Sequence, residues 1–148
     1  MHTVARSLIL PYSAPEMYSL ADDIDLYWEF LPWCENSEVL ERTATEVVAR
    51  IDVSFKGLNT SFTTRNHLVS GQEISMRLVE GPFQELAGEW RFAALDDSVC
   101  RVSLDVQFSL VGHLADRVIA PVFKQICTSL IQSFADRAKT LYGNRNFA

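Results

Sequence analysis

Apolar and polar residues alternate with a period of two along the middle of the chain, which is typical of β-strands with one buried face. The alternation is clearest over residues 102–110, and it also marks residues 47–55, 62–68, 74–78 and 86–92. Short polar turns separate these runs. We therefore expect successive strands to lie side by side as an antiparallel meander.

Helical signals lie on both sides of this strand-rich region. Near the start, a strand is expected over residues 4–10, and Ser13 is suited to cap a helix over residues 14–21. A second short helix is expected over residues 26–31, with Asp25 as its cap. Both helices precede the run of strands.

A long final helix is predicted over residues 114–142. Apolar residues recur at every fourth position, beginning with Leu114 and Val118, and predict a broad buried stripe. Pro121 predicts a kink or a fresh helix start. The predicted fold class is α+β: an antiparallel sheet of about seven strands curves around this helix, with two short helices after the first strand.

Gly88 lies between Leu86 and Trp90 on the inward face of one expected strand. An interior glycine weakens a strand and often marks a bend or the close approach of another group. A sheet that needed only a filled core would rarely leave this gap. We therefore expect room for an apolar guest between the sheet and the last helix.

The composition suits one globular domain over residues 1–148, because 48% of the residues are hydrophobic and 22% are charged. A net charge of −6 disfavours broad binding to nucleic acid, so we expect no DNA partner. Three cysteines without a Cys-x-x-Cys pair favour a reducing compartment. With no secretory leader pattern, these features predict a cytoplasmic protein, with contact at the inner membrane left open.

Signatures of catalysis are weak. The three histidines are scattered, and no Gly-x-Ser-x-Gly elbow, P-loop or dinucleotide fingerprint is present. We therefore expect no metal, no required cofactor and no enzymatic activity.

The order of elements resembles the helix-grip fold of the START-like superfamily, and the motifs resemble its coenzyme-Q-binding family. The matching stretches lie within residues 10–18, 30–34, 62–66, 81–92 and 122–138. The resemblance implies binding or chaperoning of ubiquinone, or of a related polyprenyl lipid, in support of respiratory electron transfer. One branch instead implies a toxin that blocks the joining of ribosomal subunits, and other relatives are small cyclases or hydrolases.

The candidate ligand-binding residues share the inward faces of the strands or the apolar side of the last helix. They are Val53, Phe55, Phe62, Thr64, Asn66, Met76, Leu78, Phe83, Leu86, Trp90, Phe92, Phe108, Val122, Phe123, Ile126, Leu130 and Phe134. Thr64, Asn66 and Trp90 are the expected donors to the oxygens of a quinone head. The alternative is a closed core in which Thr64 and Asn66 bond to backbone at a wet sheet end.

An apolar loop of Phe30, Leu31, Pro32 and Trp33 is a candidate gate or membrane-touching lip. The alternative is plain packing over the sheet edge. For ribosome binding, the relevant residues would be basic ones on neighbouring strands or near the C-terminus. These are Arg42, Arg50, Lys56 and Arg65, and Arg137, Lys139 and Arg145. The alternative is scattered charge that only solvates the surface.

Overall fold

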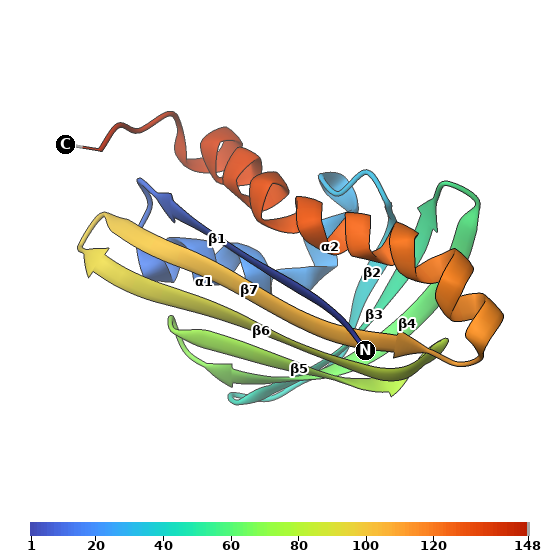
Figure 1. The fold of residues 1–148 in the computed structure, drawn as a ribbon. Helices are drawn as coiled ribbons and strands as arrows, with labels where there is room; N and C mark the ends of the chain where they lie inside the picture. The colour runs from blue at the N-terminus through green and yellow to red at the C-terminus, as the bar shows by residue number, and fades with distance from the viewer. Residues whose placement is uncertain (148) are drawn as a thin grey trace.

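Seven strands form one antiparallel sheet that curves around a long helix, as Figure 1 shows for this computed structural model, which describes residues 1–147. The strand order is β1-β7-β6-β5-β4-β3-β2, so β2 to β7 form the predicted meander and β1 pairs with β7. The strands are β1 (His2–Leu10), β2 (Cys34–Arg42), β3 (Glu46–Phe55), β4 (Leu58–Val69), β5 (Glu73–Glu80), β6 (Phe83–Asp96) and β7 (Val99–Leu110). The predicted fold class is confirmed. Residue 148 of the expected domain lies outside the described residues.

The first helix, α1 (Ala14–Asp22), has the predicted cap at Ser13. The second is a 3₁₀ helix, η1 (Ile24–Glu29), which begins earlier than predicted. Asp25 is not its cap, and this prediction was wrong. The Asp25 carboxylate instead accepts a hydrogen bond from the backbone N–H of Val39, 2.8 Å away, which ties η1 to β2.

The last helix, α2 (His113–Tyr142), crosses the concave side of the sheet without a break at Pro121 (Figure 1). A fresh helix start at Pro121 was therefore a wrong expectation. The helix α2 is long and apolar enough to cross a membrane, but in this fold it packs along β1 and β7. The predicted stripe was also wrong at its start, because Leu114 and Val118 are exposed.

The error in the stripe has a geometric cause. Each residue turns an α-helix by about 100°, so a step of four residues drifts by about 40° and cannot stay on one face for six steps. The residues of α2 that are buried follow the true helical period. They are Ala120, Phe123, Ile126, Cys127, Ile131, Phe134 and Ala138.

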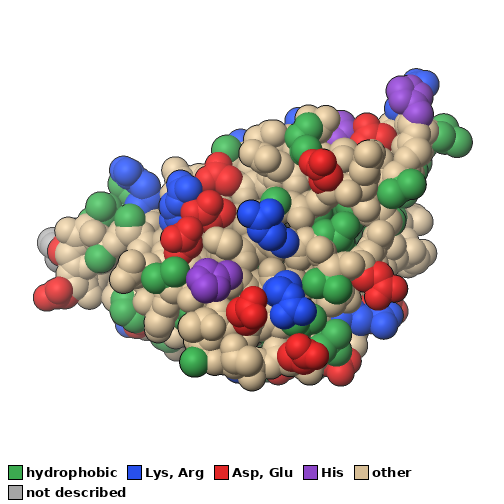
Figure 2. All heavy atoms as spheres, turned by 90° about the horizontal axis from the view of Figure 1, so that it is seen from below, with side chains coloured by type: hydrophobic (Ala, Val, Ile, Leu, Met, Phe, Trp, Pro, Cys, Tyr) green, Lys and Arg blue, Asp and Glu red, His purple; other side chains and the backbone are tan. Residues whose placement is uncertain are grey.

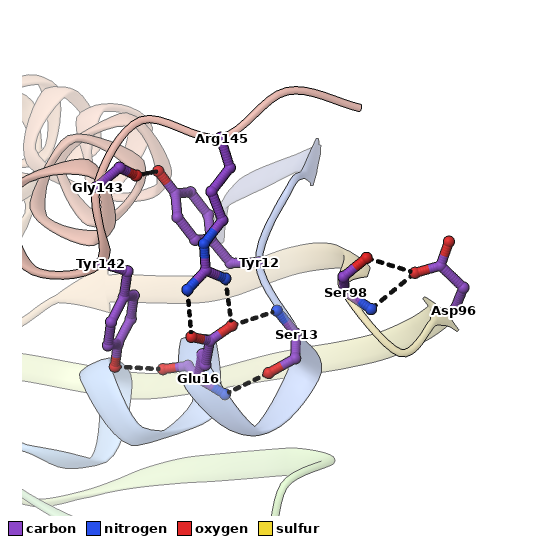
Figure 3. Close-up of polar contacts among 8 residues, drawn as sticks. All are labelled: Tyr12, Ser13, Glu16, Asp96, Ser98, Tyr142, Gly143 and Arg145. Atoms are coloured by element: carbon purple, nitrogen blue, oxygen red, sulfur yellow. Dashed lines mark hydrogen bonds and ion pairs between the residues drawn. The ribbon is translucent and has the colours of Figure 1, made fainter. Parts of the chain in front are cut away.

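The C-terminal end of α2 is fastened to α1 (Figure 3). The Arg145 guanidinium donates to both carboxylate oxygens of Glu16, at 2.8 and 2.9 Å. The hydroxyl of Tyr12 donates to the carbonyl of Gly143 (2.8 Å), and that of Tyr142 donates to the carbonyl of Glu16 (3.3 Å). The hydrogen bond from Arg145 is the main reason why the pKa of Glu16 falls to about 2.

Aromatic rings fill part of the interior between α2 and the sheet. Phe123 packs against Phe83 and Phe108, with its ring centroid 4.8 Å from each. Phe62 adds a contact at 5.9 Å to Phe123. These edge-to-face contacts hold the middle of α2 against β4, β6 and β7, and they set one boundary of the space described next.

Candidate functional site

A cavity of about 80 Å³ lies between the concave face of the sheet, α2 and η1. Its walls are almost entirely apolar. The lining residues are Ile24, Tyr27, Trp33, Ala49, Ile51, Phe62, Thr64, Asn66, Met76, Leu86, Gly88, Trp90, Leu104, Val106, Phe123, Ile126, Cys127, Leu130 and Phe134. The protein therefore has unfilled apolar volume at the position where the sequence predicted a guest.

Gly88 helps to create this space. It pairs with Met76 across β5 and β6, and a Cβ atom at Gly88 would lie 2.7 Å from the Met76 methyl group. The glycine thus admits the end of the Met76 side chain, which is half-buried and borders the cavity. Because methionine is unbranched and flexible, this part of the wall can change shape at small energetic cost.

Two neighbouring polar residues on β4 form the polar part of the wall. Thr64 and Asn66 are both buried, and the Thr64 hydroxyl donates to the Asn66 side-chain oxygen at 2.8 Å. Thr64 and Asn66 are therefore not side chains at a solvated end of the sheet that bond to the backbone, which was the alternative. No residue within the described range 1–147 accepts a hydrogen bond from the Asn66 amide nitrogen. This group is therefore free to donate to a guest.

Trp33 contributes a second free donor. Its side chain is only 4% exposed, it lines the cavity, and its indole N–H has no acceptor among the described residues. A buried donor without a partner costs about 1–3 kcal/mol, and such groups are rare in native proteins. A guest with an acceptor oxygen near Trp33 would remove this penalty.

The predicted ligand-binding residues divide into two groups. Those that line the cavity are Phe62, Thr64, Asn66, Met76, Leu86, Trp90, Phe123, Ile126, Leu130 and Phe134. Those that lie outside its wall are Val53, Phe55, Leu78, Phe83, Phe92, Phe108 and Val122. The second group packs around the cavity or nearer the sheet margin, and contact of these residues with a guest stays a prediction.

Several lining residues were not predicted. Ala49 and Ile51 share the face of Val53 on β3, and Leu104 and Val106 share the face of Phe108 on β7, so strand parity was a usable signal for all four. Cys127 follows Ile126 on α2. Ile24 and Tyr27 belong to η1, and nothing in their local pattern placed η1 over the cavity.

The candidate gate is mostly buried. Leu31 and Trp33 are buried, Phe30 is half-buried and Pro32 is exposed. The Phe30 ring packs edge-on against Phe134, with centroids 5.2 Å apart. These contacts favour the packing interpretation for the closed state, and opening at this segment stays a prediction.

Arg137 on α2 fastens the same segment. Its guanidinium lies 4.9 Å from the centroid of the Phe30 ring and donates to the Glu29 carboxylate at 2.9 Å. The Arg137 side chain is 15% exposed, but Glu29 lies at the surface, so the ion pair itself adds little and the contact with the Phe30 ring adds to it. Arg137 therefore connects α2 to η1 and the candidate gate at one end of the cavity.

The cavity wall carries no charge at neutral pH. Burial raises the pKa of the Tyr27 hydroxyl, which donates to the carbonyl of Ala21, and raises the pKa of the Cys127 thiol to about 12. Within residues 1–147 no group of three His, Cys, Asp or Glu side chains could hold a metal ion. The site is thus suited to a neutral, mostly apolar molecule with one or two acceptor atoms.

The basic residues considered for ribosome binding mostly have partners. Arginine–carboxylate pairs join Arg42 to Asp22, Arg50 to Asp52, Arg65 to Glu46, Arg137 to Glu29 and Arg145 to Glu16, and Lys56 donates to Gln125. Figure 2 shows Lys or Arg side chains interleaved with Asp or Glu on the outer face of the sheet. Neither predicted set forms an unopposed basic patch.

Comparison with known proteins places the chain in a family. It is 40% identical over 145 residues to the ribosome association toxin RatA of Escherichia coli, covering 98% of this chain and 92% of that protein. It is 22% identical to a mitochondrial coenzyme Q-binding protein COQ10 homolog B of Xenopus laevis, covering 95% of this chain and 59% of that protein. The Zhui aromatase/cyclase of Streptomyces sp. R1128 has the same fold, with a TM-score of 0.84 at 20% identity, covering 97% of this chain and 99% of that one. A family model described as polyketide cyclase / dehydrase and lipid transport matches residues 10–135, so this START-like protein belongs to that family.

Proposed function

We propose that the protein binds a neutral apolar molecule with a carbonyl-type oxygen, of the ubiquinone class, and carries it without chemical change. The observation that carries the proposal is the unpaired indole N–H of the buried Trp33 in a mostly apolar wall. The free amide of Asn66 adds a second donor. A quinone head offers acceptor oxygens on a flat, uncharged ring, which matches this combination of donors and apolar side chains.

The closed cavity is smaller than the ligand. Ligand pockets usually measure about 300–1,000 Å³, against about 80 Å³ here. Binding therefore requires movement of wall residues that are not tightly buried, for which Met76 and Leu130 are the candidates, or of the neighbouring half-buried Phe30. Each buried isoprene unit would gain roughly 4 kcal/mol before association costs, which is enough to drive such movement.

A catalytic role is not part of the proposal. The cavity wall has no carboxylate, histidine or lysine, and its tyrosine and cysteine hold their protons at neutral pH. General acid–base chemistry needs a group that titrates near the working pH. We place the carrier in the cytoplasm, with ligand exchange at the inner membrane.

The test uses a ubiquinone analogue with a short isoprenoid tail and measures its quenching of tryptophan fluorescence. Trp33→Phe removes the N–H and keeps an aromatic ring. For the Trp33→Phe variant, we expect the dissociation constant of the ubiquinone analogue to rise about 3- to 10-fold, as is typical for the loss of one hydrogen bond. Trp28→Phe is the matched control, because Trp28 is exposed and is not among the cavity-lining residues.

Two results would contradict the proposal. One is no saturable binding of the analogue by the native protein. The other is equal weakening by both tryptophan substitutions, which would place the quinone elsewhere. Extraction of lipids from gently purified protein, followed by mass spectrometry, identifies the natural guest independently of the chosen analogue.

A second candidate function is association with a ribosomal subunit. It is supported by the 40% identity, along nearly the whole chain, to a protein named a ribosome association toxin. Co-sedimentation with separated subunits at low salt tests it. Comigration with one subunit, together with a fall in intact ribosomes, would favour it, and no comigration would remove it.

A further inference from the structure

The first turns of α2 present an apolar surface to solvent. Val111, Leu114 and Val118 are 62%, 74% and 62% exposed, respectively, which is unusual for three large apolar residues so close together. Leu114 and Val118 are four residues apart and therefore share one face of the helix. We call these three residues the apolar corner.

Cationic residues surround the apolar corner. Arg117 and Lys124 are exposed, and neither forms an ion pair within residues 1–147; His113 is exposed at the start of the helix. Three carboxylates also lie at this end. Asp116 pairs with the ring nitrogen of His2 at 2.9 Å, and Glu80 and Glu85 are exposed at the neighbouring ends of β5 and β6. Arg117 and Lys124 are thus exposed cations without a carboxylate partner within residues 1–147, on a chain whose net charge is −6.

The apolar corner also projects from the body of the protein. The start of α2 extends past the margin of the sheet in Figure 1. At the corresponding end of Figure 2, a projection carries hydrophobic, basic and histidine side chains together, while the rest of that face mixes both signs of charge. A flat partner could therefore contact the projecting apolar and cationic groups together.

We infer that the apolar corner docks on an anionic lipid bilayer. Exposed Leu and Val beside Lys and Arg on a helix are the combination that binds the boundary between head groups and acyl chains. Each cation near an anionic surface adds to the attraction, which falls with salt. A protein partner would have to match the shape of the corner, whereas a bilayer requires only the adjacent apolar and cationic groups seen here.

The position of the apolar corner connects it with the cavity. One to three turns further along α2, Phe123 and Ile126 form part of the cavity wall. Pro121 lies between the two regions and cannot donate a helical hydrogen bond, which weakens the helix there. Resting on the proposed function, this arrangement would bring the cavity close to the bilayer from which an apolar guest must come.

The experiment measures co-sedimentation of the native protein with two kinds of vesicle at low salt. One kind is phosphatidylcholine alone, and the other contains about one third phosphatidylglycerol. We expect preferential binding to the anionic vesicles, about tenfold weaker for the double variant Leu114→Ser/Val118→Ser. Leu141→Ser, an exposed position at the other end of the same helix, is the matched control and should bind like the native protein.

No binding of the native protein to anionic vesicles would overturn the inference, as would equal binding by the double variant. Thermal unfolding and the fluorescence assay with the ubiquinone analogue are run on the same samples. If the double variant still binds the analogue but not vesicles, the cavity and the docking surface are separable. If the native protein binds vesicles but never the analogue, the proposed function fails and the docking surface stands.

Discussion

The two ends of α2 are held in different ways. At the C-terminal end, Arg145 forms an ion pair with Glu16, and Arg137 forms one with Glu29 of η1. The hydroxyls of Tyr12 and Tyr142 donate to backbone carbonyls. At the N-terminal end, Asp116 is the main polar attachment: it accepts from His2 and from the backbone N–H of Leu110 at 3.2 Å. Polar contacts join the C-terminal end to three parts of the chain, whereas the N-terminal turns are held by one carboxylate and by the apolar packing of Ala115 and Ile119.

This difference indicates where the cavity can open. Residues from Phe123 to Phe134 form the helical side of the wall, between the two ends. Movement is expected where few contacts must break, because local opening follows the least stable part of a structure. The N-terminal turns, with Pro121 as a weak point, are therefore the expected moving part, while the C-terminal turns keep their place on α1 and η1.

The largest expected effect comes from removing a ring in the anchored half. Phe134→Ala deletes a buried side chain that contacts Trp90, Tyr27 and Phe30, so we expect the free energy of unfolding to fall by about 3–5 kcal/mol. Leu114→Ala, in the free half, should change it by less than about 0.5 kcal/mol. Urea denaturation followed by circular dichroism measures both. Similar losses in the two variants would show that the halves are equally anchored.

A smaller effect is expected from Glu16, whose folded pKa is about 2 against an ordinary value of 4.5. A lowered carboxyl pKa stabilises the fold above the ordinary value, and this stabilisation disappears as the pH falls from about 4.5 to about 2. Because the side chain is partly exposed, we expect Glu16→Gln to lower the free energy of unfolding by about 1 kcal/mol at pH 7. Urea titrations from pH 7 to pH 2.5 measure the difference.

The control for this pH series is Glu35→Gln, an exposed carboxylate that forms no side-chain hydrogen bond within residues 1–147. The two variants should differ at pH 7 and converge in acid. A difference that persists unchanged at pH 2.5 would mean that the Glu16 side chain acts by packing or by capping α1, and not through its charge.

Strands with regular alternation were predictable, and β2 shows why others were not. In β3, β4 and β7 one face is buried, so parity alone placed Thr64, Asn66 and Phe108 on the inward side. In β2 the pairing with β3 shifts between Cys34 and Asn36 and again between Val39 and Glu41, so no single period survives. Irregular pairing removes the signal that sequence reading depends on.

The cavity was predictable from its strands and much less from its helices. Gly88 marked the space because a glycine in a strand interior needs a reason. Trp33 was identified as part of a gate, yet its role as an unpaired donor depends on its burial in the folded protein, which the local sequence does not reveal. The exposure of Leu114 and Val118 at the start of α2 was not predicted. A repeat of four residues stays close to the helical period over two turns, but it drifts off one face of the helix over six steps.

The smallest expected effect tests the free end of α2. Asp116→Asn weakens the hydrogen bond from His2, which is the main reason why the pKa of Asp116 is lowered. We expect faster amide hydrogen exchange over residues 113–120 and unchanged exchange over residues 135–142, with little change in global stability. In the native protein, the contact between His2 and Asp116 should persist at pH values above 3.8, the ordinary pKa of an aspartate. It should weaken as the pH falls through the lowered pKa of Asp116. Asp136→Asn, an exposed position in the anchored half, is the control. If Asp116→Asn accelerated exchange along the whole helix, α2 would move as one rigid unit, and its two ends would not differ in the way that their contacts indicate.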